Sequence, residues 1–327
     1  MLTDSFGRNI TYLRLAVTDR CNLRCLYCMP EKGLQWQHRT ALLSFEEIMR
    51  LLRIAAQVGI TKVRFTGGEP FLRKDFMLLL RMTMQANLFR QVSITTNGTH
   101  TGQHIPELKQ LGIHSVNLSA DTLNAERFKT ITRRDDLNAV RKTLDALLYH
   151  GITTRINAVV MQGKNEEDIA ELTALTKALP VDVRFIEEMP FNGSGQAEAP
   201  YWNHTRIVQE LEKHFGPLQR EPEIPGSTSV NYNIPGHLGR VGVIPAYTRS
   251  FCGTCNRLRI TPTGALKTCL YGKAELDLRG LMRSGDSDEQ VAHAIHEAVL
   301  RKSVDGFVAE EESKSATSFP SMATIGG

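Results

Sequence analysis

Residues 12–28 read YLRLAVTDRCNLRCLYC, so a short apolar run passes directly into three closely spaced cysteines. The run Tyr12–Thr18 has the composition of a β-strand, and a helical pattern follows at Phe45–Val58. We expect that helix to begin at Ser44, with Glu47 in capping-box register, and to end at Gly59. The chain is therefore predicted to open with a strand, a cysteine-bearing loop and a helix.

The same order of strand, loop and helix recurs until about Met189. The other candidate strands are Lys62–Thr66, Gln91–Thr95, Ser115–Ser119, Thr154–Val160 and Asp182–Ile186. Apolar residues at helical spacing lie between them, as in the stretch that Asn165 and Asp168 open and that runs to about Ala178. Because each crossover helix returns the chain to the same edge, six such units predict a parallel sheet. Eight units would close a barrel, so six leave either an open, curved barrel or a doubly wound sheet.

The pattern changes after about residue 190. We expect the segment Phe191–Pro200 to be a loop, and the segment Glu221–Gly242 is rich in proline and glycine. Helical spacing returns only at about Arg206–His214 and Asp288–Lys302. We therefore predict a first domain at residues 1–190 and an irregular C-terminal region at residues 191–327.

The composition excludes several classes of protein. The chain of 327 residues has a formal net charge of +4, with 41% hydrophobic and 23% charged residues. This charge is too small to indicate nucleic-acid wrapping or attraction to a membrane surface. No apolar run approaches the roughly 18 residues of a membrane span, and Met1–Arg8 lacks the apolar core of a secretory signal. We expect a cytoplasmic protein without nucleic-acid or membrane partners.

Polar residues follow the ends of the predicted strands. They are Thr66-Gly67-Gly68-Glu69-Pro70, Thr95-Thr96-Asn97-Gly98, Ser119-Ala120-Asp121 and Glu187-Glu188-Met189, together with the cysteine segment after the first strand. The carboxyl ends of parallel strands meet at one edge of a sheet, where such folds build active sites. Loop propensity would explain any one of these segments, but their joint placement indicates a site.

The six cysteines form two groups: Cys21, Cys25 and Cys28, and Cys252, Cys255 and Cys269. Disulfide scaffolds are usually short and secreted, so metal ligation is favoured over disulfides. Structural zinc requires four ligands, and only the distant His38 is available to complete the first group. Three thiolates can instead hold a cubane iron–sulfur cluster and leave one iron open. The sequence therefore predicts an enzyme that acts on whatever occupies the open positions.

The spacing of the first group, with Tyr27 before its last cysteine, resembles the cluster motif of radical S-adenosylmethionine (SAM) enzymes. In that family the open iron chelates the amino and carboxylate groups of SAM, and reductive cleavage gives a 5′-deoxyadenosyl radical. The segment Gly67-Gly68-Glu69-Pro70 resembles the family's second element, which meets the methionine amine. The resemblance implies SAM contacts at Tyr27, Gly68, Ser119 and Met189, and Thr95 fits a further position that touches SAM.

The second cysteine group narrows the resemblance. The run Phe251-Cys252-Gly253-Thr254-Cys255-Asn256-Arg257-Leu258-Arg259 resembles the C-terminal motif of the GTP 3′,8-cyclases, the molybdenum cofactor biosynthesis protein A family. Segments 12–14, 17–21, 63–66, 184–187 and 326–327 also match, so the resemblance covers nearly the whole chain in order. It implies a second [4Fe–4S] cluster, whose open iron binds the guanine of GTP. A structural zinc knuckle is the alternative for this group.

Basic residues on the motif segments fit a triphosphate, because arginine offers phosphate a planar, bidentate set of donors. The resemblance implies that GTP is bound by Arg14, Lys62, Arg64, Thr95, Arg155, Arg184, Arg257, Leu258 and Arg259. Relatives commonly have lysine at position 155, so the geometry of that contact changes while its charge is kept. We expect the pairs Arg133-Arg134 and Arg301-Lys302 to be solvated surface groups.

The sequence ends on Gly326-Gly327. In the family that the chain resembles, such a tail enters the active-site cavity and helps to position groups for the chemistry. Only glycine could thread a backbone into a crowded pocket without Cβ clashes. The catalytic residues that the resemblance implies are Arg257, Arg259, Gly326 and Gly327.

The resemblance implies an incomplete (β/α)6 TIM-type barrel whose open side is closed by the C-terminal region. The expected reaction removes the 3′ hydrogen of GTP, joins C3′ to C8 and gives (8S)-3′,8-cyclo-7,8-dihydroguanosine 5′-triphosphate. Expected partners are an electron donor such as a flavodoxin or ferredoxin, and cyclic pyranopterin monophosphate synthase, the next enzyme towards molybdopterin. The assembly would be a homodimer or a monomer. Two alternatives are a peptide-modifying radical SAM enzyme with auxiliary clusters and a zinc-stabilised binding module.

Overall fold

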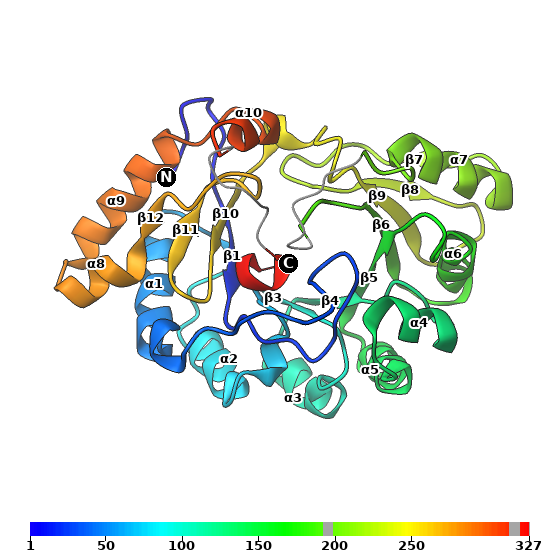
Figure 1. Ribbon diagram of the computed structural model, residues 1–327, viewed down its shortest axis with the longest axis horizontal. Coiled ribbons are helices and arrows are strands. Elements are labelled where there is room, and N and C mark those ends of the chain that lie inside the picture. The colour runs from blue at the N-terminus through cyan, green and yellow to red at the C-terminus, as the bar shows by residue number, and fades with distance from the viewer. Residues whose placement is uncertain (192–198, 314–320, 327) are drawn as a thin grey trace. The chain divides into compact units, whose positions relative to one another are not determined.

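The computed structural model describes residues 1–191, 199–313 and 321–326 (Figure 1). The chain divides into two compact units. The first contains Met1–Asn22, Leu34–Ile94 and Cys252–Gly327, and the second contains Leu23–Gly33 and Thr95–Phe251. Each unit combines a sheet of mostly parallel strands with helices, so the predicted α/β class is confirmed.

The sheet of the first unit has the strand order β12-β11-β10-β1-β2-β3. Its strands are β1 (Tyr12–Ala16), β2 (Lys62–Thr66), β3 (Gln91–Thr96, which reaches this unit's limit at Ile94), β10 (Arg257–Ile260), β11 (Ala265–Lys267) and β12 (Leu276–Asp277). Its helices are α1 (Phe45–Gln57), α2 (Phe76–Gln85), α8 (Leu278–Ser284), α9 (Asp288–Leu300), α10 (Gly306–Glu311) and α11 (Met322–Ile325). β1 pairs in parallel with β2 and β10, and β2 with β3, whereas β11 and β12 continue antiparallel.

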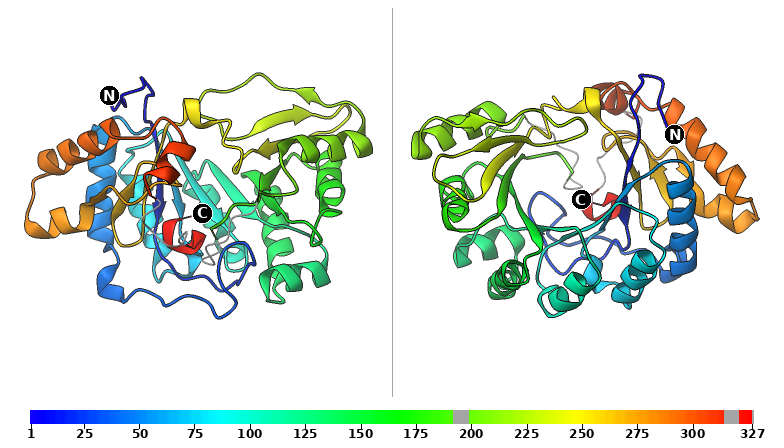
Figure 2. Two further views of the ribbon diagram at one scale, coloured as in Figure 1. Left: turned by 45° about the horizontal axis from the view of Figure 1, so that its top comes forward. Right: turned by 180° about the vertical axis from the view of Figure 1, so that it is seen from behind.

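One face of this sheet carries the apolar core of the first unit. Leu13, Phe65 and Leu258, on three adjacent strands, are almost fully buried. The Phe65 ring meets Phe76 of α2 edge-on, with 5.9 Å between ring centroids, so this is the face that the helices cover (Figure 2). Side chains alternate along a strand, so the residues next to these on β1, β2 and β10 lie on the opposite, polar face. Burying each large apolar side chain contributes about 1.5–3 kcal/mol, which fixes the choice of face.

The helix predicted after the cysteine loop is confirmed as α1. The Ser44 hydroxyl accepts a hydrogen bond from the Glu47 N–H at 3.2 Å, and the Ser44 N–H donates to Glu47 Oε2 at 2.7 Å. The predicted stop is also present, because Gly59 adopts φ 105°, a left-handed conformation that favours glycine. The helix expected to run to Ala178 is confirmed as α6. Among the residues that the structure describes, no helix combines the length and apolar character needed to cross a membrane.

The sheet of the second unit has the strand order β4-β5-β6-β9-β8-β7. Its strands are β4 (Ser115–Ser119), β5 (Thr153–Val160), β6 (Asp182–Glu187), β7 (Gln219–Arg220), β8 (Val230–Asn233) and β9 (Arg240–Ile244). Its helices are α3 (Ile105–Gln110), α4 (Ala125–Thr132), α5 (Leu137–Tyr149), α6 (Asp168–Ala178) and α7 (His204–Phe215). β4, β5, β6 and β9 pair in parallel, and β8 and β7 follow antiparallel.

The expectation of an irregular region after residue 190 is wrong in part. Two strands from that region extend the parallel pairing, because β9 pairs with β6 and β10 pairs with β1. The glycine that obscured β9 in the sequence has a packing role. A Cβ at Gly242 would lie 2.2 Å from Ser229 Oγ and 2.8 Å from Asn231 Oδ1, so only glycine permits this close approach. Most of the expected loop Phe191–Pro200, residues 192–198, lies outside the described residues.

Candidate active site

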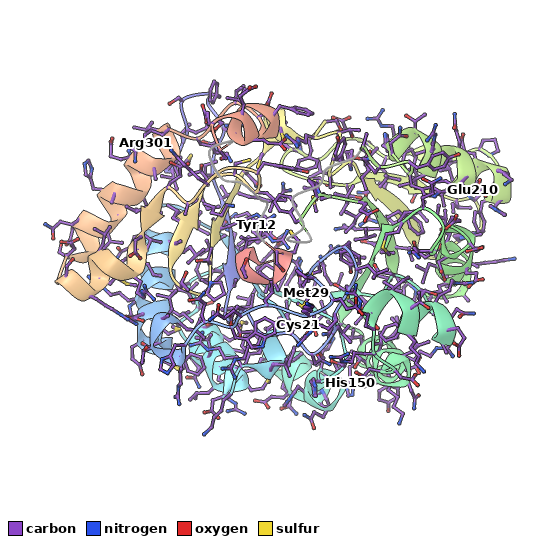
Figure 3. The ribbon with its side chains drawn as sticks, in the orientation of Figure 1. Tyr12, Cys21, Met29, His150, Glu210 and Arg301 are labelled. Atoms are coloured by element: carbon purple, nitrogen blue, oxygen red, sulfur yellow. The ribbon has the colours of Figure 1, made fainter. Side chains whose placement is uncertain are left out.

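Five cationic side chains gather on the polar face of the first unit's sheet. The parallel register of β2, β1 and β10 forms two rows: Lys62, Tyr12 and Arg257 in one, and Arg64, Arg14 and Arg259 in the other. The rows share a face because their members are two residues apart on each strand. Figure 3 labels Tyr12 on β1, the member of this array without a positive charge. We call these six residues the cation array.

Most of the cation array is buried, and Arg14 and Lys62 are partly buried, so like charges lie together with little access to water. Arg64, Arg257 and Arg259 each expose less than a tenth of their surface. Burial and then the charge of Arg259 hold the pKa of Arg14 well below its usual value, and burial and then Arg257 lower the pKa of Arg259 to about 10. The Nε of Arg14 is buried without a hydrogen-bond partner among the described residues. Desolvated like charges with unmet donors fit a ligand that carries several negative charges.

Two neighbours of the cation array differ from what the sequence led us to expect. Leu258 lies on the core face, in register with Leu13, so its side chain does not face the arginines. Lys267 on β11 was missed, although it is in register with Arg259. Burial and then the charge of Arg259 lower the pKa of Lys267 to about 8. The place of Lys267 beside Arg259 could not be predicted from the sequence, because β11 pairs antiparallel with β10 after a turn and lies outside the repeating βα units.

The C-terminal segment reaches the same face. The carbonyl of Gly326 accepts a hydrogen bond from Arg259 Nη1 at 2.6 Å. A Cβ at Gly326 would lie 2.9 Å from the Cβ of Ala16 and 3.0 Å from Cγ2 of Thr66, and its φ is 81°. Close packing and a left-handed backbone therefore both favour glycine here. Gly327 lies outside the described residues.

The second cysteine group belongs entirely to the first unit. Cys252 and Cys255 are joined by a 3.1 Å backbone hydrogen bond in a short 3-10 turn, and Cys269 follows β11. Burial raises the pKa of Cys252, and the charges of Cys269 and Cys255 raise it further, so the three sulfurs share one electrostatic neighbourhood. The chain then runs from Cys255 directly into Arg257 of β10, which connects this group to the cation array.

Buried cations hold the loop of the second cysteine group. Arg8 donates from Nη1 to the carbonyls of Cys252 at 3.1 Å and Val304 at 2.6 Å, and it pairs with Asp4. Lys302 is buried and donates to the carbonyl of Thr268, so the expectation that it is a solvated surface group is wrong. Its neighbour Arg301 is exposed, as expected (Figure 3).

The arrangement of the cysteines suits a cluster better than a single ion. In the described ranges, no three His, Cys, Asp or Glu side chains are placed to hold one metal ion. A structural zinc site needs four donors around one point. A cubane cluster has no such requirement, because each thiolate binds a different iron.

The glycines after β2 are required by the loop that leads to Cys21. A Cβ at Gly67 would lie 2.4 Å from the carbonyl oxygen of Thr18, and one at Gly68 would lie 2.2 Å from that of Arg20. The Gly68 N–H donates to the Thr18 carbonyl at 2.8 Å. Real Cβ atoms do not approach so closely, so the two glycines fix the main chain just before the first cysteine.

The other two cysteines of the first group lie in the second unit. The N–H of Cys28 donates to the carbonyl of Cys25 at 3.0 Å, which closes a tight turn. The loop is tied to the end of α4, since the N–H of Arg24 donates to Thr132 and Arg133 Nη1 donates back to Arg24 O at 2.8 Å. Arg133 is therefore not the solvated surface group that we expected, although Arg134 is exposed.

The orientation of Tyr27 is fixed by Asp121, which lies just after β4. Its hydroxyl donates to Asp121 Oδ2 at 3.0 Å, and Asp121 Oδ1 accepts from the Val159 N–H at 2.9 Å. Burial raises the pKa of Asp121 to about 7 and that of Tyr27 well above its usual value. The aromatic residue of the motif is thus oriented by a carboxyl group that the sequence analysis placed at a strand end.

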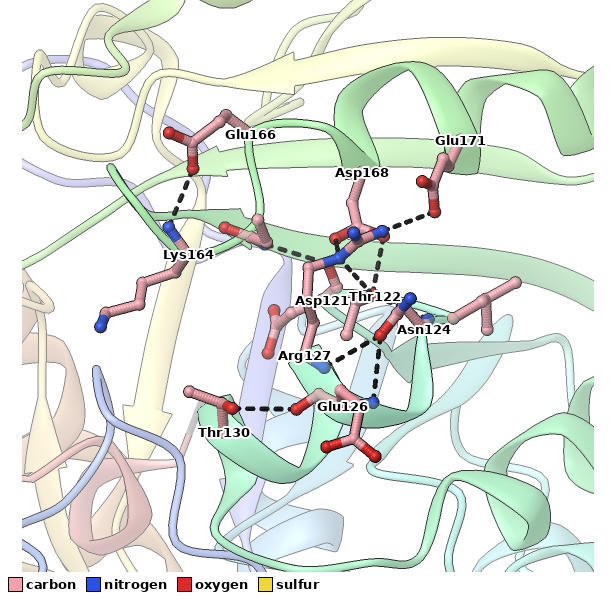
Figure 4. Close-up of polar contacts among 12 residues, drawn as sticks. Asp121, Thr122, Asn124, Glu126, Arg127, Thr130, Lys164, Glu166, Asp168 and Glu171 are labelled. Carbon is pink, nitrogen blue, oxygen red and sulfur yellow. Dashed lines mark hydrogen bonds and ion pairs between the residues drawn. The ribbon is translucent and has the colours of Figure 1, made fainter.

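An ion-pair network stabilises the turn that follows Asp121, beginning at Thr122. Thr122 donates to Asp168 Oδ1 at 2.7 Å, and Arg127 pairs with Asp168 at 2.7 Å and with Glu171 at 2.7 Å (Figure 4). The network joins α4 to α6 and fixes the turn after β4. Because its charges pair with one another, the network is typical of a structural support rather than of a ligand site.

Arg155 and Arg184 share one carboxylate in the second unit. Arg155 Nε lies 3.4 Å from Asp182 Oδ2, and Arg184 Nη2 lies 3.7 Å from the same atom. Arg240 approaches Asp182 Oδ1 at 2.9 Å. The register of β5, β6 and β9 places these residues on one face. Asp182 was not predicted as a site residue, because its contacts with Arg155 and Arg240 depend on the register of neighbouring strands.

Several polar atoms on the second unit's strands have unmet hydrogen-bonding capacity. Thr95 Oγ1, Asn117 Oδ1 and Asn157 Oδ1 are buried and have no partner among the described residues. Asn117 and Asn157 occupy the same face as Arg155, and Ser119 is in register with Asn157. Such atoms normally find a partner, so a polar ligand fits this face. Met189 follows β6 and is partly buried.

Comparison with known proteins decides the family. The model of the radical SAM superfamily matches residues 15–176, and that of Molybdenum Cofactor Synthesis C matches residues 181–307. The chain is 38% identical to the GTP 3′,8-cyclase of Desulforamulus reducens, over 92% of this chain and 94% of that protein. The chain belongs to the GTP 3′,8-cyclase family. Membership of the radical SAM superfamily implies SAM and a [4Fe–4S] cluster as cofactors.

Eukaryotic relatives are longer. The chain is 39% identical to the mitochondrial GTP 3′,8-cyclase of Arabidopsis thaliana, over 92% of this chain and 78% of that protein. It is 41% identical to Molybdenum cofactor biosynthesis protein 1 of Bos taurus, over 92% of this chain and 48% of that protein. The chain thus spans about half the length of the bovine relative.

Solved structures share the fold. SuiB of Streptococcus suis matches with a TM-score of 0.61 and 14% identity, over 83% of this chain and 63% of that one. Methylornithine synthase PylB matches with a TM-score of 0.51 and 18% identity, over 64% of each chain. At these identities the likeness establishes the radical SAM α/β fold with its parallel sheet and nothing about substrate.

Proposed function

We propose that this chain converts GTP into (8S)-3′,8-cyclo-7,8-dihydroguanosine 5′-triphosphate, as a radical SAM enzyme of molybdenum cofactor biosynthesis. The observation that carries the proposal is the cation array, which gathers five positive side chains on one sheet face, three of them buried. A triphosphate brings several negative charges, and arginine pairs with phosphate oxygens bidentately. Its negative charge would offset both the burial and the mutual repulsion that lower the pKa of Arg14 and Arg259.

The cysteines after β1 are assigned to the cofactor. Cys21, Cys25 and Cys28 would hold the [4Fe–4S] cluster, which together with SAM would supply the radical chemistry needed at the ribose 3′ position. The residues assigned to SAM are Tyr27, Gly68, Ser119 and Met189. Asp121 holds the Tyr27 hydroxyl, and Gly68 keeps the main chain before Cys21 in place, so this chain pre-orients its own SAM contacts.

The substrate is assigned to the cation array and the second cysteine group. A second cluster on Cys252, Cys255 and Cys269 would bind the guanine, while the arginines of β1, β2 and β10 bind the phosphates. The residues assigned to GTP are Arg14, Lys62, Arg64, Thr95, Arg155, Arg184, Arg257, Leu258 and Arg259, with Leu258 restricted to main-chain contact. Asp182 orients Arg155, which stands where relatives have lysine, and so supports retention of that contact.

The C-terminal residues Gly326 and Gly327 are assigned a catalytic role together with Arg257 and Arg259. The bond from Arg259 to the Gly326 carbonyl supports this role, because it joins the tail to a residue of the phosphate site. Gly327 is included in the assignment on the family resemblance alone. Glycine at position 326 lets the tail pack closely against Ala16 and Thr66, which a Cβ would prevent.

The fold is proposed to be an incomplete (β/α)6 barrel in which residues 1–190 carry the SAM cluster. Residues 191–327 would close its open side and carry the second cluster. The family assignment further supports a flavodoxin or ferredoxin as electron donor, and cyclic pyranopterin monophosphate synthase as the enzyme that takes the product. A homodimer or monomer in the cytoplasm is the proposed working form.

Turnover under anaerobic conditions tests the proposal. The protein is reconstituted with iron and sulfide, analysed for both elements, and incubated with SAM, reductant and GTP. We expect about eight irons per chain, which two cubane clusters require, together with 5′-deoxyadenosine and a product isomeric with GTP. If SAM is cleaved and GTP stays unaltered, the radical chemistry stands and the GTP substrate is wrong. Bound zinc without iron or sulfide would contradict the whole assignment.

A further inference from the structure

Tyr12 is the exception within the cation array. It occupies the centre of its row, between Lys62 on β2 and Arg257 on β10. A sixth cation at this position would have added to the phosphate-binding charge, yet the array has a tyrosine there. The side chain is almost fully buried, so it is not a surface residue that happens to lie in register.

On the basis of the function proposed above, we propose that Tyr12 is a positioning residue of the triphosphate site. Its hydroxyl orients the guanidinium of Arg64, and its ring supports Lys62 and Arg257. The residue thereby arranges cations from two neighbouring strands toward one polyphosphate.

The hydroxyl sets the direction of Arg64. Arg64 Nε donates to Tyr12 Oη at 2.7 Å, and Arg64 Nη1 donates to the carbonyl of Ile94 at 2.9 Å. Two bonds from different nitrogens leave a planar guanidinium only one orientation. Arg64 is itself buried, so loss of the Tyr12 bond would leave a charged donor without its partner.

The ring provides a surface for the other two cations of its row. Lys62 Nζ lies 4.7 Å from the centroid of the Tyr12 ring, and Arg257 Cζ lies 5.8 Å from it. Both distances fall within the range of cation–π attraction, which is stronger where water is excluded. The ring therefore draws flexible side chains from β2 and β10 towards the middle of the array.

The charges around the hydroxyl give this arrangement a pH signature. Tyr12 faces Arg14 on its own strand, Lys62 and Arg64 on β2, and Arg257 and Arg259 on β10. Burial raises its pKa, but the charges of Arg64, Arg14, Lys62 and Arg257 outweigh burial and lower it to about 7. Above that pH the phenol loses its proton and repels phosphate. The binding advantage that Tyr12 gives should therefore shrink as the pH rises from about 6.5 to 8.5.

Binding of inorganic tripolyphosphate and of guanosine separates phosphate recognition from base recognition. Calorimetry on the anaerobically reconstituted protein would compare the parent with Tyr12→Phe, which keeps the ring and removes the hydroxyl. We expect tripolyphosphate and GTP to bind about 10-fold more weakly to the variant, as for a lost bond to a charged group. Guanosine affinity should stay unchanged. The ratio of variant to parent dissociation constants should fall with pH, and this comparison cancels the titration of the ligand itself.

Three further variants keep the test specific. Tyr232→Phe removes another tyrosine hydroxyl that contacts a side chain, His204 at 3.0 Å, and should leave all affinities unchanged. Arg64→Lys keeps the charge but lacks the Nε donor, so it should weaken tripolyphosphate binding as Tyr12→Phe does. The double variant should lose little more than either single one.

Two results would overturn the inference. One is parent-like tripolyphosphate binding by Tyr12→Phe, and the other is an equal loss of guanosine and tripolyphosphate affinity, which marks a general structural defect. Failure of the parent to bind GTP at all would instead refute the proposed function. Iron content and thermal unfolding of each variant show that the chain is folded and loaded.

Discussion

At the scale of single residues, the main feature is a cluster of positive charges gathered on one face of a sheet and largely withdrawn from water. The arginines of the cation array compete with one another for stabilisation, as the lowered pKa values of Arg14 and Arg259 show. Selection for stability alone would disfavour such a cluster, since like charges held together away from water are destabilising. The highly charged anion that we propose as the substrate would offset this cost when it binds.

Arg259 gives the most direct test at this scale. Arg259→Ala should raise the KM for GTP about 10- to 100-fold, the effect of losing a hydrogen-bonded charge, and leave SAM cleavage without GTP intact. Arg301→Ala, which removes an exposed arginine, serves as the matched control and should change neither. Steady-state kinetics and 5′-deoxyadenosine yield measure the two effects. An unchanged KM would contradict the assignment of Arg259 to GTP.

Asp121 should give stability a pH dependence of its own. Burial raises its pKa from the ordinary 3.8 to about 7, so ionisation destabilises the native state. The parent therefore loses stability as the pH rises from 3.8 to about 7, and the loss is complete above about pH 7. Asp121→Asn cannot ionise at this position. Its free energy of unfolding should therefore rise relative to that of the parent, by on the order of 1 kcal/mol per pH unit. Anaerobic unfolding at pH 5, 6, 7 and 8 measures the difference, and a constant difference would refute this account.

At the scale of elements, loops and strand ends carry the candidate site residues, and the helices stabilise the sheet to which these loops are attached. The glycines after β2 show this division, because their missing Cβ atoms let one strand-end loop pack against the main chain of another. The capping box that begins α1 has no part in the site, but it fixes where the helix starts behind the sheet.

Gly68→Ala should therefore disturb the first cysteine loop selectively. Its new Cβ would lie 2.2 Å from the Arg20 carbonyl, which is main chain and cannot rotate away. We expect loss of SAM cleavage and of about half the iron, with the second cluster retained. Gly253→Ala is the control in the other cysteine loop, where the new Cβ meets nothing within 4 Å. Equal iron in the two variants would show that the glycine packing does not govern the loop.

The same scale shows how far the sequence could take the prediction. Strands with strong apolar runs and the capped helix α1 were predictable, because periodicity and capping are local signals. β9 and β10 were not, since Gly242 and the cysteine motif hid their strand character. The site residues on motifs could be proposed from the sequence, whereas the contacts of Lys267 and Asp182 depend on cross-strand register, which a single sequence does not show.

At the scale of the whole molecule, the two cysteine groups are expected to have separate tasks. Cys269→Ser should lose cyclisation and about half the iron while SAM cleavage continues. The reason is that the second cysteine group is assigned to substrate binding and not to SAM. Cys28→Ser should lose SAM cleavage and keep the second cluster. Iron analysis and product masses distinguish the two variants. Loss of all iron from Cys269→Ser would require the two-cluster assignment to be revised.

The position of the abstracted hydrogen tests the central claim most directly. The reconstituted protein would be incubated with SAM, reductant and GTP deuterated at C3′, and the 5′-deoxyadenosine would be analysed by mass spectrometry. We predict one deuterium in the 5′-deoxyadenosine and its loss from the cyclised product. If the 5′-deoxyadenosine contains no deuterium although SAM is cleaved in the presence of GTP, the ribose 3′ position is not the site of attack, and the proposed cyclisation is wrong.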